Sequence, residues 1–197
     1  MPGSRGGHRP EMQIVRQIGQ MMFSYSTDNT ANNNSYPDGN SSTEVFQKLL
    51  DGGYCSDPSI FYIPLSGKTP AKPGQKLKPE NVCFDVTSGI ASNASDGMPL
   101  IFMTGYKVTY APGGSAVPII KPYPPYGEPR TWSQWWPENP PPSPGIAVLY
   151  KGNNAVFRIL DPTVNADGSI SNFIPPDFDP KGKTYRQLTP DGPLPGK

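Results

Sequence analysis

Apolar residues recur every three to four positions near the start of the chain, from residue 11 to residue 25. The face defined by this spacing holds Ile14, Ile18, Met22 and Tyr25, with polar residues between them. Because this is the period of an amphipathic α-helix, we predict a helix over residues 11–25 that packs through these side chains. Gly19 lies inside it, and since a helical glycine costs about 0.5–1 kcal/mol relative to alanine, it indicates close packing at that point.

A second amphipathic segment follows a polar loop and turn at residues 26–39. Ser41 stands three residues before Glu44, the spacing of a capping box at the start of a helix. Gly52 and Gly53 mark the expected end. The buried face of this helix is expected to contain Val45, Phe46, Leu49 and Leu50.

Short β-branched and aromatic runs bounded by turn residues occupy the middle of the chain and are typical of strands. We predict strands over residues 81–86, 100–104, 106–110, 145–151 and 155–160. We expect the last two to form a hairpin around residues 151–154, whose glycine and asparagines favour a tight turn. Helices followed by strands without strict alternation predict an α+β fold with a small antiparallel sheet and long proline-rich loops.

Composition changes this picture in one segment. The chain of 197 residues has 27 prolines and 21 glycines, about twice the combined share of an average protein. Ten of the prolines fall within residues 117–144, and so do five aromatic residues: Tyr123, Tyr126, Trp132, Trp135 and Trp136. Because proline is excluded from sheet interiors, we predict an extended strap over the domain. Its aromatic side chains either anchor the strap or bind a glycan or protein partner.

The charged residues argue against several functions. Lys and Arg are scattered, and the net charge is +1, whereas nucleic-acid binders concentrate basic residues on one face. The one histidine, His8, lies in residues 1–10, which we interpret as a flexible tail. Histidine-dependent catalysis and multi-histidine zinc sites are therefore not expected. Asp177 and Asp179 lie among turn residues without an apolar setting that would raise a carboxyl pKa, so no enzyme is expected.

Cys55 and Cys83 allow a single internal disulfide. In an oxidising compartment such a bond would contribute about 3 kcal/mol. Cys83 also lies in an apolar stretch, which favours the alternative of two buried thiols. The sequence leaves both alternatives open, a disulfide or two buried thiols.

The segment over residues 16–29 (RQIGQMMFSYSTDN), followed by residues 36–39 (YPDG), resembles the bacterial type II secretion pseudopilins and related prepilin-type proteins. Residues 145–158 resemble the closing hairpin of that family more loosely, because Gly152, Asn153 and Asn154 replace its usual Asp-Gly-His. The family's leader, its start sequence and its apolar half-helix are not present. We therefore expect a soluble part in which residues 1–10 replace the anchor, residues 11–188 form one pilin-like domain and residues 189–197 are frayed.

The resemblance implies a non-enzymatic subunit of a pseudopilus or type IV pilus-like apparatus. Such a subunit would be anchored in the inner membrane in its full-length form and would face the periplasm or the cell exterior. Its implied partners are other pilin-like subunits and the secretion machinery, with no nucleic acid. The alternative is a periplasmic or cell-surface module that uses the aromatic strap to bind a glycan or protein.

The resemblance also raises calcium, which some major pseudopilins bind in a loop near the C-terminal end. Oxygen ligands of the type that calcium prefers are available in several loops. The candidates are Asp28, Asn29, Asp38, Asp161, Asn165, Asp167, Asp177 and Asp179. Solvated turns explain Asp and Asn in loops equally well, and no EF-hand spacing is present. No metal or other cofactor is therefore assigned.

Overall fold

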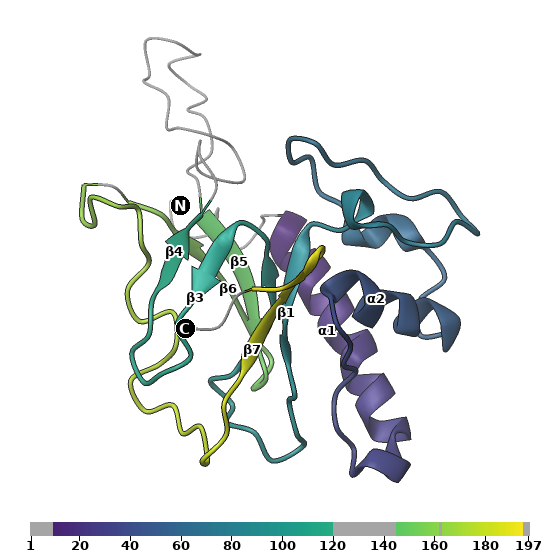
Figure 1. Cartoon of the computed structure of the whole chain (residues 1–197), viewed down its shortest axis with the longest axis horizontal. Helices are drawn as coiled ribbons and strands as arrows, with labels where there is room; N and C mark the ends of the chain where they lie inside the picture. The colour runs from purple at the N-terminus through teal and green to yellow at the C-terminus, as the bar shows by residue number, and fades with distance from the viewer. Residues whose placement is uncertain (1–9, 120–144, 162, 195–197) are drawn as a thin grey trace, which may run out of the picture.

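The computed structural model describes residues 10–119, 145–161 and 163–194. Within these residues, two helices cover one face of a six-stranded sheet, and a two-stranded sheet lies on the opposite side (Figure 1). Every strand pair is antiparallel. The fold is thus mixed α+β with one long N-terminal helix, as the sequence predicted at this level.

Both predicted helices are present. α1 (Pro10–Asp28) is longer than predicted at each end, and α2 (Ser42–Asp51) begins after its N-cap residue Ser41. The Glu44 N–H donates to Ser41 Oγ at 3.0 Å, which confirms the predicted cap. Short 3-10 turns occur in the connections: η2 (Thr30–Asn32), η3 (Pro58–Phe61) and η4 (Pro79–Asn81).

The six-stranded sheet combines the middle of the chain with its end. Its strands are β1 (Phe84–Ser88), β2 (Pro99–Met103), β5 (Gly145–Tyr150), β6 (Asn154–Ile159), β7 (Arg186–Thr189) and β8 (Gly192–Pro193). Their spatial order is β6-β5-β2-β1-β7-β8. Residues 151–153 connect β5 to β6, so the predicted hairpin is confirmed.

The strand predictions differ from the structure at several places. The predicted strand at 81–86 begins only at Phe84, since residue 81 ends the 3-10 turn η4. The predicted strand at 106–110 is shortened to β3 (Tyr106–Val108), which leaves the main sheet and pairs with β4 (Ala116–Pro118). The expectation of a frayed segment at 189–197 is wrong for residues 189–194, because β7 and β8 form a hairpin there. The Thr43 hydroxyl of α2 donates to the Pro190 carbonyl at 2.8 Å and fixes the turn of that hairpin.

The central strands are buried on both faces. Every residue of β1, β2 and β5 is buried, because the helices cover one side and the small sheet with the 163–185 segment covers the other (Figure 1). On the helix side, Gly19 of α1 lies against Leu149. On the opposite side, the Phe102 and Phe173 rings lie 5.6 Å apart, and the Tyr150 hydroxyl donates to the Phe173 carbonyl at 2.6 Å. This double coverage explains why β2 and β5 are continuous runs without polar side-chain groups other than the Tyr150 hydroxyl.

Candidate functional site

The aromatic residues of the predicted strap lie outside the described residues. These are Tyr123, Tyr126, Trp132, Trp135 and Trp136, and His8 lies outside as well. Their binding role stays a prediction.

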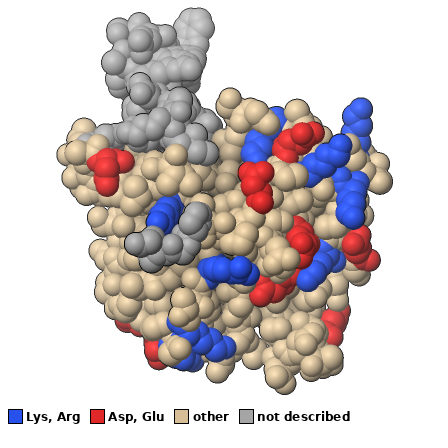
Figure 2. All heavy atoms as spheres, in the orientation of Figure 1, with Lys and Arg blue, Asp and Glu red and all other residues tan. Residues whose placement is uncertain are grey.

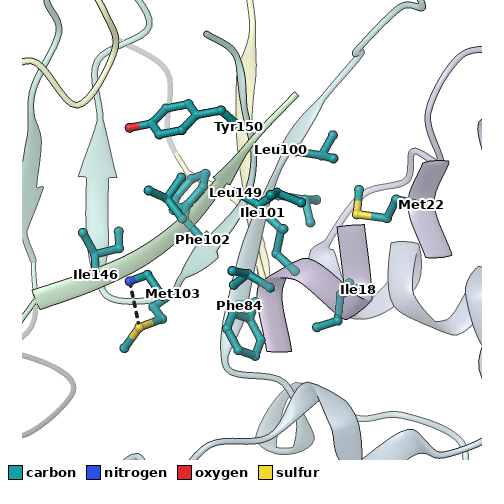
Figure 3. Packing of buried hydrophobic residues seen from close by; sticks show 14 of the residues in the cluster. Ile18, Met22, Phe84, Leu100, Ile101, Phe102, Met103, Ile146, Leu149 and Tyr150 are labelled. Carbon is teal, nitrogen blue, oxygen red and sulfur yellow. Dashed lines mark hydrogen bonds between the residues drawn. The ribbon is translucent and has the colours of Figure 1, made fainter. Parts of the chain in front are cut away.

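The packing face of α1 is only partly the predicted one. Ile18 and Met22 are buried, and Figure 3 shows both on the side of the sheet that carries Leu100. Ile14 and Tyr25 are half-buried at the edges of this contact. Val15, which the prediction omitted, is fully buried instead of Ile14. Ile14 and Val15 are adjacent and fit the helical period almost equally well, so spacing alone did not decide which of them is buried.

Gly19 marks the closest approach of α1 to the sheet. A Cβ atom built at this position would lie 1.9 Å from Leu149 Cδ2, where no atom can be accommodated without movement. Leu149 is itself buried in β5, so its side chain has little room to shift. The close packing expected from a helical glycine is therefore present at this residue.

The asparagine-rich loop closes the C-terminal end of α1. Asn34 Nδ2 donates to the Ser26 carbonyl at 2.9 Å and to the Thr27 carbonyl at 3.2 Å. These are among the last carbonyls of the helix, which lack partners within it. Asn34 has a φ of 57°, a left-handed conformation that asparagine tolerates better than most residues. The loop therefore has a structural role of its own.

Asp38 joins three parts of the chain. Its Oδ1 accepts from the Gly39 N–H and from the Ser88 hydroxyl, each at 2.8 Å, and its Oδ2 accepts from the Gly89 N–H at 3.1 Å. Its backbone carbonyl accepts from Lys48 Nζ of α2 at 2.5 Å. The turn at residues 36–39 thus ties α2 to the end of β1, which gives this part of the family-like motif a structural explanation.

Three of the other calcium candidates accept hydrogen bonds in local turns. Asp161 Oδ1 accepts from the N–H and hydroxyl of Thr163, and Asp167 and Asp179 accept from N–H groups two residues on. Asp28 accepts from the Tyr54 hydroxyl at 2.6 Å. Across the described ranges, no cluster of three or more His, Cys, Asp or Glu side chains could hold a metal ion. Turn formation accounts for Asp161, Asp167 and Asp179, and the bond from Tyr54 accounts for Asp28.

The disulfide that the sequence allows is not formed. Cys55 and Cys83 are free thiols, both buried. Cys83 Sγ donates to the Ile63 carbonyl and Cys55 Sγ donates to the Asp57 carbonyl, each at 3.3 Å. Burial raises the pKa of both thiols, which disfavours the reactive thiolate. The alternative of two small buried side chains is the one that the structure contains.

A carboxyl group, Asp85, is buried in the centre of the sheet. Gln187 Nε2 of β7 donates to Asp85 Oδ2 at 2.7 Å, whereas Oδ1 has no hydrogen-bond partner among the described residues. Desolvation by burial raises the pKa of Asp85 to about 7, and the side chains of Gln187 and Thr104 offset only part of this effect. The sequence signal was a lone aspartate within an apolar strand, and the prediction did not use it.

Gln187 extends this network to the second sheet. Its Nε2 also donates to the Tyr106 carbonyl at 2.6 Å, and its Oε1 accepts from the Val108 N–H at 2.9 Å. One side chain therefore connects β1, β7 and β3. We refer to Asp85, Gln187 and the β3 backbone groups that they bind as the polar junction.

A groove of about 430 Å³ lies beside α1. Its lining includes Gly19, Phe23 and Ser24 of the helix, with Tyr36 and Lys151 opposite. Phe23 is 58 % exposed, which is unusual for a phenylalanine next to a concave surface. We refer to Phe23 and the groove together as the helix groove. An exposed ring beside a groove is typical of a surface that another molecule covers.

Comparison of the chain with protein-family models, with curated proteins and with solved structures finds no match. Among the described residues, neither helix combines the length and the hydropathy that a bilayer-spanning segment needs. The assignment of a function therefore depends on the geometry of the chain itself and on the sequence resemblance described above.

Proposed function

We propose that this chain is the globular part of a pilin-like protein, a non-enzymatic structural subunit of a pseudopilus or type IV pilus-like envelope apparatus. The observation that carries the proposal is the placement of α1. One face of this helix packs on an antiparallel sheet through Val15, Ile18 and Met22. Beside this face, Phe23 lies in solvent one helical turn after Gly19, at the edge of the helix groove.

This arrangement suits a subunit that assembles through its first helix. A helix that only completes its own domain has polar residues on its outer face. On α1, the outer side combines glutamines with an exposed aromatic ring, so a neighbouring subunit could bury apolar area there. The loop and turn at residues 29–39 support the proposal, since Asn34 binds the last carbonyls of α1 and Asp38 ties the turn to the end of β1.

Site-specific photo-crosslinking in the native organism tests the contact. A photoreactive phenylalanine analogue is placed at Phe23, and a matched control at Val164, which is 74 % exposed in the loop after β6. Illumination should crosslink position 23 to further copies of this chain or to another pilin-like subunit, and should do so much less at position 164. Equal labelling at the two positions, or crosslinks only to unrelated proteins, would contradict the proposal.

Processing of the native gene product supplies an independent test. A prepilin-type protein is cut by a dedicated peptidase ahead of an apolar segment of about 20 residues, which is the length needed to cross a bilayer. The N-terminus of the mature protein should therefore differ between wild-type cells and cells that lack that peptidase. Removal of a conventional signal peptide instead, with the same mature N-terminus in both strains, would rule out the pilin assignment.

A further inference from the structure

A second groove lies far along the chain from α1, between β3 and the segment that leads into β7. It has a volume of about 500 Å³, within the range of about 300–1,000 Å³ typical of small-ligand sites. One side is formed by residues 107–112, and the other by Pro180 and residues 183–187, with Leu194 at one end. We refer to it as the β3–β7 groove.

The charged side chains that line this groove are all cationic. Its lining contains the cationic side chains of Lys107, Lys183 and Arg186 and no carboxylate. All three are exposed, and none forms an ion pair within the part of the chain that the structure describes. Figure 2 shows blue groups on the face that β3 and β7 occupy in Figure 1. For a protein with a net charge of +1, this is a local concentration of positive charge.

Two tyrosine rings line the same groove. The rings of Tyr110 and Tyr185 lie 6.2 Å apart, and both residues are half-buried. The Tyr110 hydroxyl is hydrogen-bonded to Thr87 Oγ1 at 2.7 Å, and the Tyr185 ring packs against Phe178 at 6.4 Å. The rings are therefore held in place before any ligand arrives, which reduces the entropy lost on binding.

The backbone at this groove offers little to an extended peptide. Peptides that add to a sheet edge bind through free N–H and C=O groups. Here the Val108 N–H and the Tyr106 carbonyl are already bound to the Gln187 side chain. The Gln187 carbonyl accepts from the Leu194 N–H at 2.9 Å. Recognition in this groove must therefore rely on side chains, namely three cations and two aromatic rings.

We propose that the β3–β7 groove binds an acidic oligosaccharide. Tyrosine rings can stack on the apolar faces of sugar rings, and the carboxylate or sulfate groups of such a sugar would bind Lys107, Lys183 and Arg186. The proposal does not depend on the pilin assignment, because the groove lies on β3 and β7 and involves neither α1 nor the helix groove. It also differs from the glycan role predicted for residues 117–144, since it uses none of those side chains.

Calorimetric titration of the full 197-residue chain tests the proposal. The probes are oligogalacturonate as a carboxylated sugar, a heparin-derived oligosaccharide as a sulfated one, a cello-oligosaccharide as a neutral one, and poly-glutamate as an acidic peptide. At least one acidic sugar should bind, and comparison of the carboxylated with the sulfated sugar shows which anionic group the groove prefers. Stronger binding of poly-glutamate than of both acidic sugars, equal binding of the neutral sugar, or no binding of either acidic sugar would each overturn the proposal.

Variants then locate the site. Lys183→Gln combined with Arg186→Gln should weaken binding of the acidic sugar by about tenfold or more, because two charge-assisted contacts are lost. The matched control, Lys72→Gln combined with Lys76→Gln, removes two exposed cations outside the groove and should leave the affinity unchanged. Tyr185→Phe, which keeps the ring, should bind like the wild type, and Tyr185→Leu should not. An equal loss in both double variants would show a diffuse charge effect and would overturn the assignment.

Discussion

The two contacts that organise this molecule differ in chemistry. The contact of α1 with the sheet is apolar, with Ile18, Met22 and Leu149 buried and Gly19 allowing close approach. The polar junction is equally buried but depends on hydrogen bonds from Gln187 to Asp85 and to β3. The first contact is stabilised by burial of apolar surface area, and this free energy changes gradually with the area that is removed from water. The second depends on individual partners, so the loss of one leaves others buried and unpaired.

The difference also determines how each contact responds to conditions. The Met22, Ile18 and Leu149 side chains of the apolar contact have no ionisable group. The polar junction contains Asp85, whose pKa burial raises to about 7. We therefore expect changes of pH to act on the β1–β7 part of the sheet, and changes of side-chain volume to act on α1.

The largest effect is expected at Gln187. Gln187→Ala removes three buried hydrogen bonds, those with Asp85 Oδ2, the Tyr106 carbonyl and the Val108 N–H. At about 1–3 kcal/mol for each buried group left unpaired, the free energy of unfolding should fall by several kcal/mol. Urea unfolding measures it, with Gln17→Ala on the exposed face of α1 as the control. A loss no larger than in the control would show that the polar junction contributes little.

The pH dependence of stability should change next most. The pKa of Asp85 is about 7 in the folded protein against an ordinary value of 3.8, so between these values the folded state holds a proton that the unfolded state has released. Stability from this group is therefore highest at low pH and falls as pH rises through this window, by about 1.4 kcal/mol per unit of pKa difference.

Unfolding measured between these pH values in Asp85→Asn should lack this decline, since the amide carbonyl can still accept from Gln187. Asp177→Asn, an exposed control, should keep the wild-type slope. Parallel stability curves for the wild type and Asp85→Asn would contradict an elevated pKa.

Core truncation on α1 should have an intermediate effect. Ile18→Ala removes a fully buried side chain and should lower the unfolding free energy by about 2–4 kcal/mol. Ile14→Ala, at a half-buried position on the same helix, should cost clearly less. Denaturant unfolding of both variants gives the comparison. If Ile14→Ala proved the more costly change, the packing face would be the one predicted from spacing.

The smallest effect is expected at Gly19. Gly19→Ala improves helix propensity but places a Cβ against Leu149 Cδ2, so we expect a net loss of about 1 kcal/mol. A double-mutant cycle with Leu149→Ala isolates the contact, and the double variant should lose less than the sum of the single losses. Strict additivity would show that the two residues do not restrict one another.

The apolar contact could largely be predicted from the sequence, because period and capping are local signals. Both helices and the β5–β6 hairpin are of this kind, and Ser41 is bound as its spacing indicated. The polar junction could not be predicted, because β7 is short and contains Arg186 and Gln187, which resemble loop residues. The strand β7 is held in place by pairing with β1, which lies far away in the sequence. Asp85 offered a signal, but its partner depends on that distant pairing.

The candidate-site residues divide in the same way, into those that local spacing predicts and those that only the tertiary fold brings together. Ile18 and Met22 were identified from their spacing, but the helix groove was not, because Phe23 falls outside the packing face and exposure cannot be read from periodicity. The β3–β7 groove was missed for a different reason. Its cations come from two segments that only the tertiary fold brings together, so along the chain they look scattered.

The position of β7 has a consequence for how the molecule is made. Val86 pairs with Leu188, so β1 emerges from the ribosome about a hundred residues before the strand that covers its edge. Until then, β1 presents unpaired backbone groups to which other chains can add. A protease that removes the last dozen residues would recreate that open edge and leave Asp85 without Gln187. The C-terminal hairpin therefore covers an edge of β1 that stays open to other chains until β7 has been made.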